Sequence, residues 1–335
     1  MITIVLGVVG ALALAALLGV SDAPNAAAAL LGARSGSYTA VAAWSVAWHL
    51  AGGLLAGEAV ARTVVGIVHV DAGATATVLA AASFTAVGFS WATTRQGLPT
   101  SASVGLVGGL AGAGVAAGGT GAIEWGGLAR GRPVGVLGVL IGIFLAPVLA
   151  ALVAGLVDRV ARQAAFRLPR AARREVHGGL WLASAAVAVA DGANDGQKAM
   201  GLLAVALSGT ASLGTTGGIA PFDRVSCAVI LAVATAFGGR KIVARVSRGL
   251  SRDSAVDDLS AQCASAGVIL LGAAVGFPLS TSTVVTSAMV GAGMSGRRRH
   301  VRWAGVLRIV AVWVLTVPAC GLVAVGVFEL LRMLP

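Results

Sequence analysis

The sequence predicts an all-α polytopic membrane protein: two inverted-topology repeats with broken helices and re-entrant hairpin segments, about 10–12 membrane segments in all. Composition and hydropathy are the first two observations. Hydrophobic residues make up 57% of the 335 residues, charged residues only 11%, and the mean hydropathy is +0.92. A soluble domain carries about 25% charged residues. The third observation is a pair of repeated polar segments. The composition and the hydropathy exclude a soluble Rossmann or TIM-type domain.

Apolar runs near span length follow one another along the whole chain. The first run lacks the basic residues that precede the apolar stretch of a signal peptide, so we expect it to begin a spanning helix. The three cysteines are far apart in sequence and indicate neither a disulfide nor a metal site. The runs are 2–20, 39–57, 76–93, 104–118, 134–157, 178–190, 199–212, 222–238, 264–275, 283–294 and 303–328.

Two polar segments of the first half recur in the second half. Segment 19–26 resembles 192–199 when Asp22 is set against Asp195, and segment 97–103 resembles 276–282. Such internal similarity is typical of transporters built from inverted repeats. The predicted organisation is a first repeat at 1–157, a basic cytoplasmic linker at 158–177 and a second repeat at 178–335. Each repeat is expected to cross the membrane three times and to add one hairpin, which inverts the second repeat.

The net charge of +11 marks membrane topology in this interpretation. Six basic residues lie in 158–177, five in 240–252 and four in 297–302. Clusters of this kind between apolar runs are what the positive-inside rule produces, and we place all three in the cytoplasm, with both termini outside. No groove-reading motif accompanies them, so nucleic acid is not an expected partner. The predicted location is the inner (plasma) membrane.

Acidic and amide side chains fall where the membrane interior is expected, directly after the run 2–20 and between the runs 178–190 and 199–212. Asp22 and Asn25 are spaced i, i+3, and a second set at i, i+3, i+4 and i+7 forms one polar stripe. An ionisable group in the bilayer interior costs about 3 kcal/mol or more, so these residues need a function. We expect broken helices here, with cation or proton sites. An exposed loop, or simple neutralisation of an acid by the lysine, is the alternative. The stripe consists of Asp191, Asn194, Asp195 and Lys198.

The repeated segments 97–103 and 276–282, here called the first and second Pro-Ser segments, each open onto an apolar run. Hydroxyl groups and free backbone N–H groups at a helix N-terminus form an anion site. The alternative is ordinary N-capping. Two copies beside two acid-amide segments favour an oxyanion site. Its hydroxyl residues would be Ser101, Ser103, Ser280, Thr281 and Ser282.

Arg95 precedes the first Pro-Ser segment and has no basic counterpart in the second. It could neutralise an anionic substrate, or it could extend to the membrane interface. We keep both interpretations and include it among the candidate substrate-binding residues.

The stretch 191–201, Asp-Gly-Ala-Asn-Asp-Gly-Gln-Lys-Ala-Met-Gly, together with the two Pro-Ser segments, resembles the inorganic phosphate transporter (PiT) family, in its bacterial low-affinity branch. The likeness extends from Gly19 to the 303–318 helix. It implies a secondary transporter, often a homodimer, that moves phosphate with sodium or protons, in some members as a metal–phosphate complex. Some relatives carry sulfate.

This sequence departs from the family pattern at several positions. Ser21 and Pro24 stand in the first signature segment, and Ala102 replaces a usual threonine. Lys198 takes the place of the asparagine found in sodium-coupled members. We expect Lys198 to occupy space that sodium fills elsewhere, leaving protons as the coupling ion. The alternative is a sodium site formed by Asp22, Asn25, Asn194 and Asp195.

The predicted function is therefore import of inorganic phosphate by proton or sodium symport through an alternating-access site near the membrane midplane. A sulfate or other tetrahedral-oxyanion permease of the same fold is the alternative. An anion channel and an intramembrane enzyme are less favoured. The aspartates could form an acid–base pair, but the duplicated serine segments have no role in that chemistry. No resident cofactor is expected.

Overall fold

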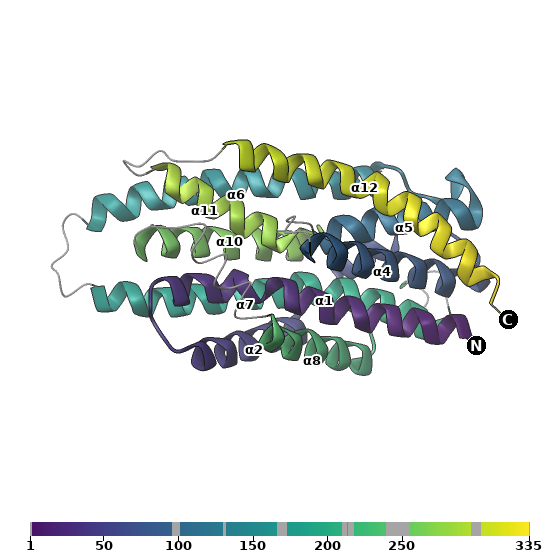
Figure 1. Cartoon of the computed structure of the whole chain (residues 1–335), viewed down its shortest axis with the longest axis horizontal. Coiled ribbons are helices and arrows are strands. Elements are labelled where there is room, and N and C mark those ends of the chain that lie inside the picture. Colours follow the sequence, from purple (N-terminus) through teal and green to yellow (C-terminus); the bar gives the residue numbers. More distant parts are fainter. Residues whose placement is uncertain are drawn as a thin grey trace.

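The computed structural model describes residues 2–95, 101–129, 132–165, 173–209, 213, 218–238, 255–295 and 303–334. It is a bundle of helices whose axes run mainly along the long dimension of the molecule (Figure 1). A small hairpin, β1 (Gly127–Ala129) and β2 (Arg132–Val134), interrupts the helices. The helices are α1 (Ile2–Gly32), α2 (Tyr38–Leu55), α3 (Ala59–Val65), α4 (Ala72–Arg95), α5 (Ala102–Gly118), η1 (Thr120–Ala122), α6 (Gly135–Ala165), α7 (Arg173–Ser208), α8 (Pro221–Phe237), α10 (Ala255–Val275), α11 (Thr281–Ser295) and α12 (Trp303–Arg332).

Five helices within the described ranges are long and apolar enough to cross a membrane, namely α1, α4, α6, α10 and α12. A sixth span is formed if α2 and α3, which meet at an angle of 74°, are counted together. The 36-residue α7 is long enough but carries the polar stripe. The all-helical, multi-span class predicted from the sequence is confirmed.

The helix contacts made by one half of the chain recur between the corresponding helices of the other half. Helix α1 packs against α8 and α4, as α7 packs against α2 and α10. Helix α5 packs against α12, as α11 packs against α6. Each contact thus has a counterpart across the two halves, as a pseudo-two-fold arrangement requires. Both termini lie at one end of the molecule, and α6 ends and α7 begins at the other (Figure 1).

Glycines allow two of these helix pairs to approach closely. A Cβ atom at Gly19 of α1 would lie 2.1 Å from the Leu231 carbonyl oxygen of α8. A Cβ atom at Gly192 of α7 would lie 2.3 Å from the His49 carbonyl oxygen of α2. These glycines are the aligned first residues of the two repeated signature segments, so both segments begin where two helices touch backbone to backbone. Small residues serve this purpose in membrane helix packing.

The expectation that the helices break at the acid-amide segments is wrong. Helix α1 continues through Asp22 and Pro24, and α7 continues through all four residues of the stripe. The second Pro-Ser segment is the break, since residues 276–280 separate α10 from α11. Gly276, with φ of 95°, turns the chain there, a conformation that favours glycine. In the first Pro-Ser segment, residues 97–100 are outside the described part of the chain.

The predicted basic loops fall mostly outside the described residues. Segments 240–252 and 297–302 lie there entirely, and so do residues 166–172 of the predicted linker. Residues 158–165 of that linker belong to α6 and 173–177 to α7. Arg162 of α6 donates to Asp158 Oδ2 at 2.7 Å and also bonds to Asp257 of α10. This ion cluster joins the two repeats near the end of α6.

Candidate functional site

The acid-amide residues of α1 and α7 meet in one buried cluster between the two halves. Asn25 Nδ2 donates to Asp191 Oδ2 at 2.9 Å and also lies 3.3 Å from Asp22 Oδ1. The side chains are buried within continuous helices, which excludes the exposed-loop alternative. The exposed fractions are 2% for Asp22, 6% for Asn25, 0% for Asp191, 0% for Asn194, 1% for Asp195 and 0% for Lys198.

The start of α11 contributes hydroxyl groups to this cluster. Thr281 Oγ1 lies 2.9 Å from Asp22 Oδ1 and 3.1 Å from Asp195 Oδ2, so its single proton can serve either carboxylate. Ser282 Oγ donates to Asp22 Oδ1 at 3.2 Å. The second Pro-Ser segment therefore contacts acids from both halves, as its repetition beside the acid-amide segments predicts.

Lys198 connects three parts of the cluster. Its Nζ atom donates to Asp195 Oδ1, to Ser103 Oγ at 2.7 Å and to the Leu279 carbonyl oxygen at 2.5 Å. Ser103 Oγ in turn donates to the same Leu279 carbonyl at 3.2 Å. One buried ammonium group thus holds the start of α5 against the break before α11. Neutralisation of Asp195 is part of its role, but the bond to Ser103 also ties the two Pro-Ser segments together.

The other predicted residues lie at the edges of the cluster. Asn194 Nδ2 donates to the Phe277 carbonyl oxygen at 3.0 Å, and Phe277 precedes the second Pro-Ser serines. Ser101 caps α5 by accepting from Val104 N at 3.4 Å. The Ser280 carbonyl oxygen accepts from Thr283 and Val284 N in the first turn of α11. Ser101 and Ser280 are buried.

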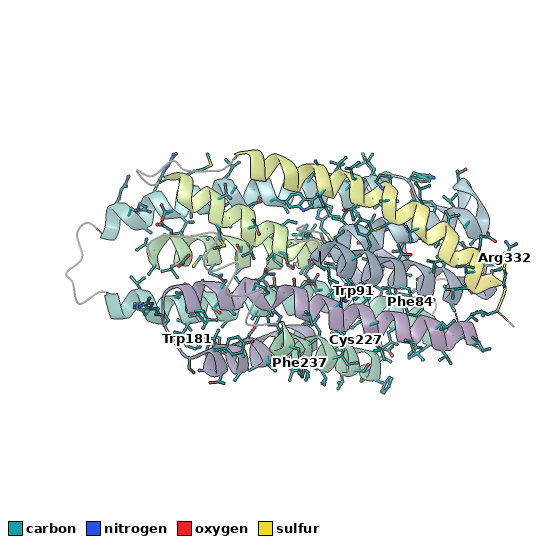
Figure 2. The ribbon with its side chains drawn as sticks, in the orientation of Figure 1. Phe84, Trp91, Trp181, Cys227, Phe237 and Arg332 are labelled. Atoms are coloured by element: carbon teal, nitrogen blue, oxygen red, sulfur yellow. The ribbon has the colours of Figure 1, made fainter. Side chains whose placement is uncertain are left out.

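Arg95 has different surroundings. It is the exposed last residue of α4, and its guanidinium lies 3.9 Å from the centroid of the Trp91 ring. Figure 2 shows Trp91 nearer the middle of the long axis than Arg332, which lies at the end that carries the termini. The described contacts place Arg95 on an aromatic side chain and not on a carboxylate of the cluster.

Sequence reasoning missed two residues of this site. His49 of α2 is fully buried, with Nε2 3.9 Å from Asp191 Oδ2. Gln262 of α10 donates to the Asn25 carbonyl oxygen at 2.8 Å. An imidazole in the middle of an otherwise apolar run was the available signal for His49. Gln262 gave no comparable signal, because it falls just before the 264–275 run.

Several polar atoms of the cluster have no hydrogen-bond partner. These buried atoms are Asp22 Oδ2, Asp191 Oδ1, Asn194 Oδ1, Gln262 Oε1 and His49 Nε2. Three carboxylates against one ammonium give a formal charge of −2 if all are ionised. Burial opposes such a charge unless protons or cations neutralise it. The arrangement is suited to binding cations or protons beside a group of hydroxyl donors.

Among the described residues, no three His, Cys, Asp or Glu side chains are arranged as a metal site. Lys198 Nζ lies beside the Asp195 carboxylate, whose oxygens a sodium site at this position would use as ligands. The ammonium therefore occupies part of the space that such a site would need.

A profile of the phosphate transporter family matches the chain twice, over residues 18–177 and 159–324. The two matches together cover nearly the whole chain and overlap in the predicted linker.

Curated relatives carry the same kind of name. A protein of Rhizobium meliloti (strain 1021) named "Probable low-affinity inorganic phosphate transporter" is 31% identical over 91% of this chain and 90% of its own length. One of Mycobacterium tuberculosis (strain ATCC 25618 / H37Rv) with the same name is 34% identical over 71% of this chain. The match spans 56% of that mycobacterial protein, so this chain corresponds to about half its length.

One solved structure shares the fold. It is described as "The sodium-dependent phosphate transporter" and matches over 100% of both chains with a TM-score of 0.82 and 19% identity. The family profile and the Rhizobium relative agree with the predicted family, and the solved structure agrees with the predicted fold.

Proposed function

Because this chain belongs to the phosphate transporter family, we propose that it is a secondary transporter that imports inorganic phosphate together with protons. The observation that carries the proposal is the buried cluster in which carboxylates of α1 and α7 face hydroxyl groups at the starts of α5 and α11. The relatives' names favour phosphate, and nothing in them favours the sulfate alternative.

Phosphate would bind at the two helix starts. The N-termini of α5 and α11 supply N–H groups and the positive ends of the helix dipoles. The hydroxyl groups come from Ser101, Ser103, Ser280, Thr281 and Ser282. The amides of Asn25 and Asn194 are further donors. The hydroxyl groups of Ser103, Thr281 and Ser282 and both amides now donate within the protein, so phosphate would replace these bonds.

A proton on Asp22 provides the coupling. Thr281 and Ser282 both contact Asp22 Oδ1. A carboxylate accepts stronger hydrogen bonds than a neutral carboxyl group. Protonation of Asp22 therefore frees two hydroxyl groups for phosphate and removes one negative charge that would repel it. Asp191 and Asp195 are further sites for protons. Phosphate retains a proton at neutral pH and sulfate does not, which favours phosphate beside acids.

Transport would proceed by movement of the repeats around this site. We place the protein in the plasma membrane with segments 158–177, 240–252 and 297–302 in the cytoplasm, and we expect a homodimer. Lys198 fills space that sodium would need, so protons are the proposed coupling ion.

Uptake of labelled phosphate and sulfate into liposomes tests the proposal. An inward proton gradient is expected to drive phosphate accumulation at least tenfold above the level without a gradient, and a protonophore is expected to abolish it. Asp22→Asn should lose the accumulation, whereas the exposed control Asp71→Asn should retain it. Accumulation driven by sodium alone would overturn proton coupling. Sulfate uptake in place of phosphate uptake would overturn phosphate as the substrate. Dependence of uptake on magnesium would indicate that a metal–phosphate complex is transported.

A further inference from the structure

His49 lies in the middle of α2 and faces α7. Its side chain is fully buried, as is that of Asp191, and the distance from His49 Nε2 to Asp191 Oδ2 is 3.9 Å. The backbone approach at Gly192 fixes this part of α2 against α7, because the His49 carbonyl oxygen occupies the space of a side chain there.

The neighbouring turn of α2 determines which ring nitrogen carries the proton. His49 Nδ1 lies 2.8 Å from the Ser45 carbonyl oxygen, which only accepts hydrogen bonds. Nδ1 is therefore the donor in the neutral ring. The lone pair of Nε2 is left on the side of Asp191, and Nε2 has no hydrogen-bond partner. Asp191 Oδ1 also has no hydrogen-bond partner.

We propose that His49 Nε2 and Asp191 form a second proton-binding site of the transporter, and that this site sets the pH dependence of phosphate uptake. The proposal rests on the function proposed above. A proton from the outer solution binds to the Nε2 lone pair and gives an imidazolium, which neutralises the adjacent Asp191 carboxylate. The proton leaves to the other side when the site opens there. No bond other than N–H forms or breaks.

This site is connected to the substrate through Asn25. Asn25 Nδ2 donates to Asp191 Oδ2, the same oxygen that His49 Nε2 faces, and lies 3.3 Å from Asp22 Oδ1 and 3.5 Å from Thr281 Oγ1. When His49 is protonated it competes for Asp191 Oδ2. The amide of Asn25 is then released to donate toward the hydroxyl side of the cluster. Loading of this proton thereby adds a donor where phosphate would bind.

The other charged groups around α2 lie farther along the helix. Helix α2 packs against α7, α8 and α1. Helix α7 brings Asp191 against His49, and its Asp195 and Lys198, which pair with each other, lie one and two turns farther along. Helix α1 brings Asp22, which bonds to α11. Helix α8 brings Asp223, Arg224 and Cys227. Arg224 bonds to the Ala56 carbonyl oxygen and lies 4.0 Å from Glu58. Ala56 is about 10 Å along the helix from His49, at 1.5 Å per residue.

The pH profile of uptake tests the proposal. Histidine changes charge between about pH 5 and 8, and glutamine does not. We expect wild-type phosphate uptake to be high at pH 6 and to fall about tenfold by pH 8, because the protonated form is lost as the pH rises. His49→Gln should show a flat profile over this window. His177→Gln, at the histidine that bonds to Ser35 at 2.6 Å, is the matched control and should keep the wild-type profile.

A second measurement does not depend on transport. Nitrogen-15 NMR of histidine-labelled protein in nanodiscs, without phosphate, reports protonation of Nε2 directly, with His49→Gln identifying the signal. We expect the wild-type Nε2 signal to change to that of a protonated nitrogen when the pH is lowered, and this change to move in Asp191→Asn. A wild-type pH profile in His49→Gln, or an Nε2 that does not titrate, would overturn the inference. Wild-type protein that takes up no phosphate while Nε2 titrates would overturn only the proposed function.

Discussion

The two acids of the α7 stripe, four residues apart, have different partners. Asp195 is paired with the Lys198 ammonium and accepts from Thr281. Asp191 receives one bond, from Asn25, keeps one oxygen without a partner and faces the unprotonated nitrogen of a histidine. Both acids are buried on the same helix. The difference therefore comes from what the neighbouring helices bring to each end of the stripe.

This difference assigns separate roles to the two ends. At the Asp195 end, Lys198 ties the starts of two helices together, and a group so fully bonded is suited to hold the structure. At the Asp191 end, His49 Nε2 and Asp191 Oδ1 have no hydrogen-bond partner among the described residues, so a proton can bind there directly. Buried polar groups without partners are uncommon in native proteins and call for an explanation of this kind.

Removal of the lysine should have the largest effect. Lys198→Met leaves Asp195 buried without its ion pair, which typically costs about 3–5 kcal/mol in the free energy of unfolding. It also removes the ammonium donor from Ser103 Oγ and from the Leu279 carbonyl oxygen, which keep their bond to each other. Thermal unfolding in detergent measures the loss.

The double variant Asp195→Asn/Lys198→Met serves as the control. It removes both charges and should recover most of the stability, while phosphate uptake remains lost. A Lys198→Met protein as stable as wild type would contradict the structural role of the Asp195 end.

Loss of the Asn194 amide should have an intermediate effect. Asn194→Ala removes one of the two donors to the Phe277 carbonyl oxygen, which keeps its bond from Leu279 N at 2.9 Å. The loss of one such hydrogen bond costs about 0.5–1.5 kcal/mol, and the cavity left by the amide adds to this cost. Gln197→Ala is the matched control. Gln197 lies on α7, as Asn194 does, and its Oε1 atom accepts from Val60 N of α3 at 2.9 Å. Both variants should unfold at similar temperatures. The KM for phosphate should rise only in Asn194→Ala, and equal KM values would remove Asn194 from the substrate site.

Much of this site could be predicted from the sequence. Charged residues are so few that Asp22, Asp191 and Asp195, each beside an apolar run at membrane depth, indicate a function by themselves. The repeat of the Pro-Ser segments predicts that hydroxyl groups join them. The spacing of Asp22 and Asn25 predicts a shared helix face, which the 3.3 Å contact confirms.

Other features depend on packing that the sequence does not reveal. Pro24 argued for a broken helix, but a proline inside a membrane helix is tolerated when neighbours satisfy the freed backbone groups. The carbonyl that Pro24 leaves without its helical donor is that of Val20, four residues earlier. Ser184 Oγ donates to the Ala26 carbonyl oxygen and Gln262 to that of Asn25, so α7 and α10 bond to α1 just after Pro24 and hold the continuous helix in place. The pairing of His49 with Asp191 depends on how α2 packs against α7, and no local pattern encodes that contact.

Removal of the α5 cap should have a smaller effect. Ser101→Ala loses the bond to Val104 N, and loss of an N-cap serine costs about 1 kcal/mol. Thermal unfolding should show a slightly lower midpoint than in wild type. Ser37→Ala, at the exposed cap of α2, provides the comparison, since it removes the same kind of bond away from the site. If only Ser101→Ala weakens phosphate binding, the hydroxyl acts on substrate as well as on the helix.

The smallest effect on stability is expected at Asp191, and this expectation distinguishes the two ends of the stripe most sharply. Asp191→Asn keeps an oxygen that can accept from Asn25 and removes a charge that burial disfavours. We expect the free energy of unfolding to change by less than about 1 kcal/mol, against the 3–5 kcal/mol expected for Lys198→Met. Proton-driven phosphate accumulation should nevertheless be lost, because the carboxylate that stabilises a protonated His49 is gone. Destabilisation as large as that of Lys198→Met would mean that Asp191 is as firmly bonded as Asp195, and the proton would then have to bind elsewhere in the cluster.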